Sequence, residues 1–149
     1  MRPVLLLRIA SVLTFIHAAL HTIGGVFGQT PPVVQQVVAA MKANEFVAMG
    51  VTRTLWDFHM GLGLAVSVFL TVEAVVFWQL GSLAKTDALQ LRPILATFLL
   101  GYLGVAIVSY KYFFAGPVVT EVLIALCLGL AIVGAKQGAT GEVDRRAVA

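Results

Sequence analysis

Four long apolar segments constrain the fold of this chain more than any other feature of its sequence. They cover residues 4–27, 55–80, 93–114 and 117–135. A helix of about 20 apolar residues crosses the hydrocarbon core of a bilayer, and each segment is close to that length. Charged residues make up 11% of the 149 residues, whereas a soluble domain carries about 25%. The sequence therefore predicts an all-α, polytopic membrane protein with four transmembrane helices in an antiparallel bundle.

Two further segments complete the predicted organisation. Residues 1–136 are expected to form a single transmembrane domain, and residues 137–149 a cytoplasmic tail. After two prolines, residues 31–46 place apolar side chains at helical spacing, at Val34, Val37, Val38 and Met41. This pattern predicts a short amphipathic helix in the membrane interface. Such a helix could connect two spans or cover a site as a lid, and the sequence leaves both interpretations open.

The distribution of basic residues predicts the orientation of the spans. One side of the predicted membrane carries seven Lys and Arg residues, namely Arg2, Arg8, Lys85, Arg92, Lys136, Arg145 and Arg146. The other side carries three, namely Lys42, Arg53 and Lys111. Cytoplasmic loops are enriched in Lys and Arg. Both termini are therefore predicted to be cytoplasmic, in a protein of the bacterial inner membrane.

Several classes of protein are disfavoured because the sequence lacks their motifs. It has no nucleophile elbow, phosphate-binding loop or redox cysteine pair, which argues against serine hydrolases, ATPases and disulfide exchangers. The net charge of +3 comes from scattered basic residues, which argues against a nucleic-acid partner. The expected partners are membrane lipids and a lipophilic small molecule, and a homo-oligomer or a larger membrane complex stays open.

The first span contains an unusual sequence, TFIHAALHTIGG, at residues 14–25. His17 and His21 are four residues apart, so they lie within about 40° of each other on a helix. The same stripe carries small residues, namely Ala10, Thr14, Gly24 and Gly28. Small residues let membrane helices approach one another closely. The histidine face is therefore predicted to point into the bundle.

His59 and Glu121 are predicted at a similar depth in the membrane. Each lies near the start of its span, so both share the outer half of the membrane with His17 and His21. Ionisable residues within spans usually face the bundle interior and mark functional sites. We therefore expect a pocket in which the three histidines bind a cofactor or metal ion, with Glu121 as a fourth metal ligand. The same four residues are the candidate catalytic residues, although Glu121 could instead pair with Lys111.

Three chemistries fit this pocket, and the sequence does not choose among them. Two histidines four residues apart on a helix can share a metal ion. A haem would need ligands from facing helices, such as His59 with His17 or His21. A lipophilic ligand could undergo oxidoreductase or isomerase chemistry at a histidine that transfers protons near neutral pH. Alternatively, the protein is a non-enzymatic small membrane subunit or assembly factor, and its histidines only pack helices or contact a partner.

Other polar and aromatic residues have expected structural roles. Thr54 and Asp57 have the spacing of a capping box at the start of the second span. Glu73 lies on the same helix face as His59 but about 21 Å along the axis, where it would be protonated, paired or exposed to water. The aromatic residues expected at the membrane interfaces are Trp56, Trp78, Tyr102, Tyr110 and Tyr112.

The first half of the chain resembles a known family. The features concerned are HTIGG in the first span, the extramembrane helix after it, and WDFHMGLG at the second span. Together they resemble a family of small bacterial four-helix integral membrane proteins. The resemblance implies the four-span fold and marks His21, Gly24 and Gly25 as signature positions. It implies no activity.

Overall fold

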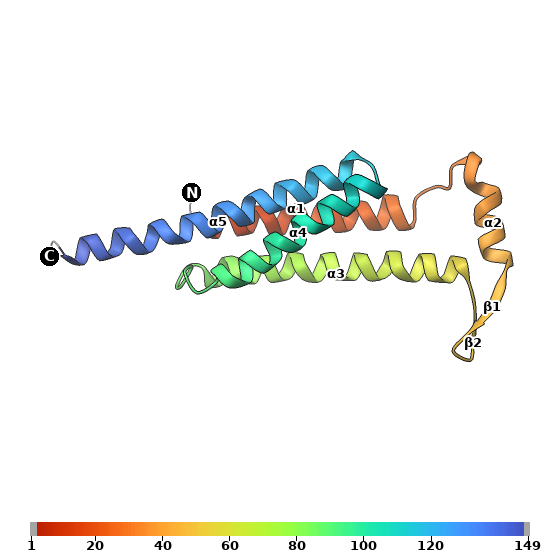
Figure 1. The fold of residues 1–149 in the computed structure, drawn as a ribbon, viewed down its shortest axis with the longest axis horizontal. Helices are drawn as coiled ribbons and strands as arrows, with labels where there is room; N and C mark the ends of the chain where they lie inside the picture. Colours follow the sequence, from red (N-terminus) through yellow and green to blue (C-terminus); the bar gives the residue numbers. More distant parts are fainter. Residues whose placement is uncertain (1–2, 148–149) are drawn as a thin grey trace. The chain divides into compact units, whose positions relative to one another are not determined.

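The computed structural model describes the backbone of residues 3–147 and the side chains of residues 3–135. Its elements, in chain order, are helix α1 (Pro3–Leu20), the π-helical turn η1 (His21–Val26), the 3₁₀ turn η2 (Pro32–Val34), helix α2 (Gln35–Ala43), strands β1 (Glu45–Ala48) and β2 (Val51–Thr54), and helices α3 (Leu55–Leu83), α4 (Arg92–Tyr112) and α5 (Ala115–Ala147) (Figure 1). Within this described part, four helical segments are long and apolar enough to cross a membrane, namely Pro3–Val26, Leu55–Leu83, Arg92–Tyr112 and Ala115–Ala135. The predicted all-α fold with four spans is confirmed, and these helices fit an integral membrane protein.

Two compact units make up the chain. The first unit consists of Met1–His17 and Thr71–Ala149, and the second unit consists of Ala18–Leu70. Helices α1 and α3 each begin in one unit and end in the other. The contacts that define the candidate sites each lie within one unit.

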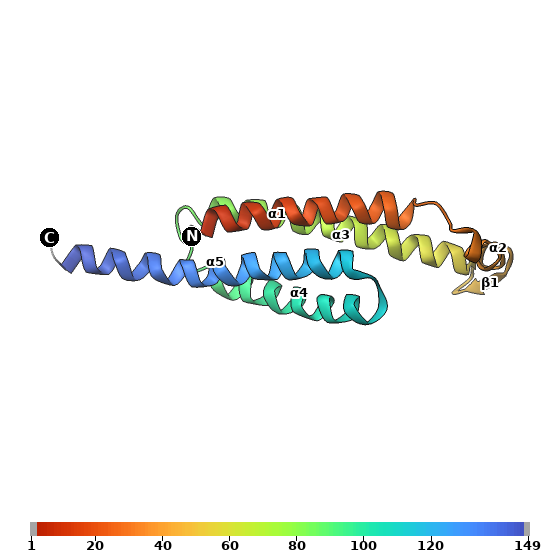
Figure 2. The same cartoon turned by 90° about the horizontal axis from the view of Figure 1, so that it is seen from above.

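In the first unit, parts of α1, α3, α4 and α5 pack around a core of large apolar side chains. The most deeply buried are Leu6, Leu7, Phe77, Leu95, Ile124 and Leu128. The Phe77 ring meets the Phe98 ring edge-on, with 4.9 Å between the ring centroids. Helices α4 and α5 run side by side and are joined at residues 113–114 (Figure 2). The third and fourth spans therefore form a helical hairpin, which agrees with the antiparallel arrangement predicted for them.

The spans start as local chemistry predicts. The Thr54 N–H donates to Asp57 Oδ2 over 2.8 Å, and the Asp57 N–H donates to Thr54 Oγ1 over 3.1 Å. This reciprocal pair confirms the capping box predicted for α3. Pro93 and Pro117 lie in the first turns of α4 and α5, where a missing N–H breaks no helical hydrogen bond. Helix α5 continues to Ala147, so the described part of the predicted tail extends the fourth helix.

The connection between the first two spans differs from the helix predicted over residues 31–46. It is helical only through η2 and α2, which ends at Ala43, and residues 45–54 form an antiparallel hairpin. Met49 and Gly50 form the two-residue turn of this hairpin, with φ angles of 50° and 84°. Such turns usually carry Asn-Gly or Asp-Gly, so the Met-Gly pair hides the signal from sequence patterns. The predicted helix therefore extends too far at its C-terminal end. The β1–β2 hairpin was not predicted from the sequence.

The first span ends in a π-helical turn rather than in a regular α-helix. The Phe27 N–H donates to the Thr22 carbonyl oxygen, five residues earlier, over 3.0 Å. Gly28 follows this turn, and a Cβ atom there would collide with the Gly24 carbonyl group. A Cβ atom built on Gly24 meets none of the described neighbouring groups within 4 Å. The turn therefore requires glycine at position 28 but tolerates a side chain at position 24.

Replacing Gly28 should damage the end of the first span, whereas replacing Gly24 should not. We expect Gly28→Ala to lower the free energy of unfolding by roughly 1–3 kcal/mol, because the backbone must shift to admit the methyl group. Gly24→Ala is the matched control and should change this free energy by less than about 1 kcal/mol. Denaturant unfolding of both purified variants in one detergent, followed by circular dichroism, makes the comparison. Wild-type stability of Gly28→Ala would contradict the described turn.

Candidate functional site

The four residues predicted to form one ligand site have different surroundings. His17 and His21 are half-buried, His59 is exposed and Glu121 is buried. His17 and Glu121 belong to the first unit, and His21 and His59 belong to the second. Across the residues that the structure describes, no group of three or more His, Cys, Asp or Glu side chains is arranged to hold a metal ion. The predicted ligands are therefore not gathered into one such group.

His21 joins the π-helical turn to α3 through a carbonyl group. Its Nε2 atom lies 3.1 Å from the Gly63 carbonyl oxygen. A carbonyl oxygen only accepts hydrogen bonds, so Nε2 carries the hydrogen and donates it. Beside it, the Thr22 hydroxyl donates to Ser67 Oγ over 2.8 Å, and the Ser67 hydroxyl donates to the same carbonyl oxygen over 3.1 Å. These contacts match the alternative interpretation in which His21 packs helices together.

At the start of α3, His59 lies beside an aromatic side chain that is also in contact with a cation. Its ring centroid is 5.2 Å from that of the Trp56 ring. The Lys42 Nζ atom lies 4.6 Å from the centroid of the Trp56 ring, which is a cation–π contact. Trp56 thus contacts a cation and an imidazole near the end of a span, where an interfacial tryptophan is expected.

A chain of hydrogen bonds in the first unit joins three helices. The Tyr102 hydroxyl on α4 donates to Glu73 Oε2 on α3 over 2.8 Å. The Tyr102 oxygen also lies 3.3 Å from the Thr14 hydroxyl oxygen on α1. The Thr14 hydroxyl also donates to the Ala10 carbonyl oxygen of its own helix over 2.9 Å, so either hydroxyl group can be the donor in the longer contact between Thr14 and Tyr102. Two hydroxyl groups in series therefore lead to the Glu73 carboxyl group.

Among the residues joined by these hydrogen bonds, Tyr102 is the one whose role the sequence predicted wrongly. The prediction of an interfacial anchor is wrong for Tyr102, because only 5% of its surface is exposed and its hydroxyl is hydrogen-bonded between helices. Aromatic belts lie at the ends of spans, whereas Tyr102 lies in the middle of α4. That central position is the signal that could have identified it.

Glu121 is a buried carboxyl group with 3% of its surface exposed. The Ser109 hydroxyl donates to its Oε1 atom over 2.9 Å. Its Oε2 atom is also buried and accepts no hydrogen bond from the residues that the structure describes. Among the described residues, Ser109 is therefore the hydrogen-bond partner of this carboxyl group, rather than Lys111, which the sequence offered as an alternative.

Both carboxyl groups meet the same face of α4. Tyr102 and Ser109 are seven residues apart, so they share a face of the helix with roughly 10 Å of rise between them. Ala106 lies between them on this face, and its small side chain is buried. Helix α4 thus aligns a polar strip, which we define as Thr14, Glu73, Tyr102, Ser109 and Glu121.

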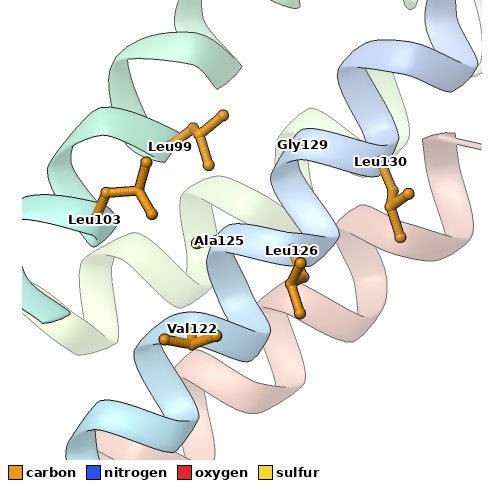
Figure 3. A pocket seen from close by; sticks show the side chains of 7 residues that line it. All are labelled: Leu99, Leu103, Val122, Ala125, Leu126, Gly129 and Leu130. Carbon is orange, nitrogen blue, oxygen red and sulfur yellow. The ribbon is translucent and has the colours of Figure 1, made fainter.

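An apolar groove of about 280 Å³ is present in the same unit, and its lining includes no residue of the polar strip (Figure 3). It lies between α4 and α5 and is lined by Leu99, Leu103, Val122, Ala125, Leu126, Gly129 and Leu130. Val122 directly follows Glu121 in α5, and Ala125 lies one helical turn after it. Ala125 and Gly129 are small and leave space that larger side chains would fill. The groove and Glu121 therefore involve the same turns of α5, although Glu121 does not line the groove.

The polar strip is the strongest candidate for a functional site. It gathers side chains from all four membrane-spanning helices. By contrast, the contacts of His21 and His59 are those of residues with structural roles. Of the four residues predicted from the sequence, Glu121 belongs to this strip. No family model, curated protein or solved structure matches the chain.

A double-mutant cycle measures the hydrogen bond between Tyr102 and Glu73. Tyr102→Phe and Glu73→Ala should each lower the free energy of unfolding, and the two losses should not add because they remove the same bond. We expect a coupling energy of about 0.6–1.7 kcal/mol, as for hydrogen bonds between other membrane helices. Unfolding of the purified variants in mixed detergent micelles gives the four free energies.

The control cycle pairs Tyr102→Phe with Thr97→Ala. The Thr97 hydroxyl donates to the Pro93 carbonyl oxygen of its own helix over 3.1 Å, so this pair should show no coupling. Fully additive losses in the Tyr102 and Glu73 cycle would show that their hydrogen bond contributes nothing to stability.

Proposed function

We propose that the protein binds a lipophilic molecule within its membrane-spanning helices, with an apolar tail in the α4–α5 groove and a hydrogen-donating head group at Glu121. The observation that carries this proposal is the buried Glu121 Oε2 atom, which accepts no hydrogen bond from the described residues. A buried acceptor without a partner costs roughly 1–3 kcal/mol, and a hydroxyl or N–H group of a ligand would recover that energy. A lipophilic ligand is one of the three kinds that the sequence left open, but its proposed site moves from the histidines to α4 and α5.

The groove suits a hydrocarbon or isoprenoid tail. Its lining residues are all apolar, and its volume is about 280 Å³. Ligand pockets for drug-sized molecules span about 300–1,000 Å³, so the groove holds only part of a larger molecule. A chain-like ligand would fill it and gain dispersion contacts with α4 and α5. The rest of such a tail would lie among the lipid tails.

The head group would meet residues that can exchange protons with it. Glu121 Oε2 is placed to accept a hydrogen bond or a proton from a ligand hydroxyl group, while Ser109 holds the other carboxyl oxygen at 2.9 Å. Farther along the same face of α4, Tyr102 leads to the second carboxyl group, that of Glu73. Intramembrane carboxyl groups of this kind are typical of proton relays. The polar strip therefore supports acid–base chemistry on the head group, as a quinol or an isomerisable lipid would require.

Molecules that co-purify with the full-length protein test this proposal. We expect the wild type, extracted in mild detergent, to retain an enriched lipophilic species that carries a hydroxyl or N–H group. Gly129→Leu fills the groove, and Glu121→Gln replaces the free acceptor with an amide. Each variant should lower retention by about tenfold or more, which corresponds to about 1.4 kcal/mol of binding energy. Mass spectrometry of organic extracts measures the retained species.

Glu45→Gln is the matched control for the loss of a carboxylate, because Glu45 is exposed in β1. It should leave the retained species unchanged. Identical lipid profiles in the wild type, Gly129→Leu and Glu121→Gln, with all three folded by circular dichroism, would contradict the proposal.

We also propose that both termini are cytoplasmic and that the membrane is the bacterial inner membrane. The support is the excess of basic residues on the side that carries the termini, seven against three. Lys85 and Lys111 lie near opposite ends of α4, so they report on opposite sides of the membrane. Their accessibility therefore distinguishes the two orientations.

Labelling of single cysteines tests the orientation. In a Cys127→Ser background, Lys111→Cys should react with a membrane-impermeant maleimide in intact spheroplasts, because the proposed topology places it outside. Lys85→Cys should react only after the membrane is permeabilised. The reverse pattern would show that the termini are on the outer side.

A further inference from the structure

The β1–β2 hairpin has two chemically different faces. Cross-strand partners in an antiparallel pair lie on the same face, and faces alternate along each strand. One face therefore carries Phe46, Ala48, Val51 and Arg53. The other carries Glu45, Val47, Thr52 and Thr54. The first face is apolar apart from one cation, whereas the second carries a carboxylate and two hydroxyl groups.

An aromatic contact orients the hairpin relative to the start of α3. The Phe46 ring stacks on the Phe58 ring, with 5.7 Å between the centroids and 18° between the planes. Phe58 lies one turn into α3, which begins directly after β2. The Phe46 face is therefore turned toward the membrane-spanning part of α3. Within the second unit, Figure 1 shows both strands running across the direction of the start of α3.

The tip of the hairpin is apolar and exposed. Met49 is fully exposed at the turn, and 46% of the surface of Val51, on the Phe46 face, is exposed. The φ angle of Met49 is 50°, a conformation that residues other than glycine, asparagine and aspartate rarely adopt. The two-residue turn requires this backbone conformation. The exposure of the methionine side chain is a separate feature, and a surface that receives this side chain accounts for it.

We propose that this hairpin anchors the second unit to the lipid surface, with Phe46, Met49 and Val51 entering the boundary between head groups and acyl chains. Arg53 shares the Phe46 face, and Lys42 lies over the Trp56 ring. Both cations are thus close to the level at which lipid phosphate groups would lie. Aromatic, apolar and basic side chains in this combination are typical of interfacial membrane binding. The anchor is independent of the ligand proposed for the first unit.

The depth of the hairpin tip in a bilayer tests this anchor. Full-length protein with Cys127→Ser and either Met49→Cys or Thr52→Cys is labelled with an environment-sensitive fluorophore. Both proteins are placed in nanodiscs of equal parts phosphatidylcholine and phosphatidylglycerol. We expect nitroxide-labelled lipid to quench position 49 several-fold more than position 52, and aqueous iodide to quench it several-fold less. Thr52 is the matched control because it lies on the opposite face of the same hairpin.

Two results would overturn the anchor. Equal iodide quenching at both positions would place the whole hairpin in water. Protection of position 49 from both quenchers would show that protein, rather than lipid, covers the tip. Val51→Cys, on the Phe46 face and outside the turn, repeats the measurement if labelling at position 49 disturbs the fold.

Discussion

Hydrogen bonding in a hydrocarbon environment is the constraint on which the rest of this structure depends. Lipid tails neither donate nor accept hydrogen bonds, so the backbone of every span must satisfy itself by forming a helix. Polar side chains face the same requirement. Tyr102 donates to Glu73, Thr14 contacts Tyr102 and donates to its own helix, and Ser109 donates to Glu121. In this setting Glu121 Oε2 accepts no hydrogen bond from the described residues, which is why we propose it as the point where a ligand binds.

The sizes of side chains divide α5 into two surfaces. Ile124 and Leu128 are fully buried and belong to the apolar core of the first unit. Their sequence neighbours Ala125 and Gly129 line the groove beside α4. Small residues usually bring membrane helices into close contact. In the helical hairpin of α4 and α5 they also leave space, so α5 contributes both to the packed core and to the apolar groove.

The features that the sequence predicted correctly are local ones. Span length depends on consecutive apolar residues, and the capping box depends on Thr54 and Asp57 three residues apart. The hairpin was missed because its turn carries Met49 where a turn-forming residue is usual, and local patterns then favour a longer helix. The π-helical turn was missed because the apolar content of HTIGG is equally compatible with a regular α-helix.

The candidate site was only partly predictable because it depends on contacts between distant residues. Helix α4 is apolar around most of its circumference, so hydrophobic periodicity does not reveal which face meets the other helices. Tyr102 and Ser109 become members of the polar strip only when that face is known. Glu121 was identifiable from the sequence because a carboxylate inside a span is conspicuous wherever it points.

The chemistry of the acceptor explains why carboxyl groups, rather than histidines, define this site. A neutral histidine has one donor and one acceptor, and His21 uses its donor on a carbonyl group that α3 already provides. A helix offers many such carbonyl oxygens, so a membrane histidine finds a partner without any ligand. A carboxylate has only acceptors, and donors are scarce in a span because backbone N–H groups are used in the helix. Glu73 accepts a hydrogen bond from Tyr102. Glu121 accepts one hydrogen bond, from Ser109, at only one of its two buried oxygens. For the ionised Glu121 side chain, the second oxygen therefore defines what the proposed ligand must bring, which is a hydrogen-bond donor on an otherwise apolar molecule.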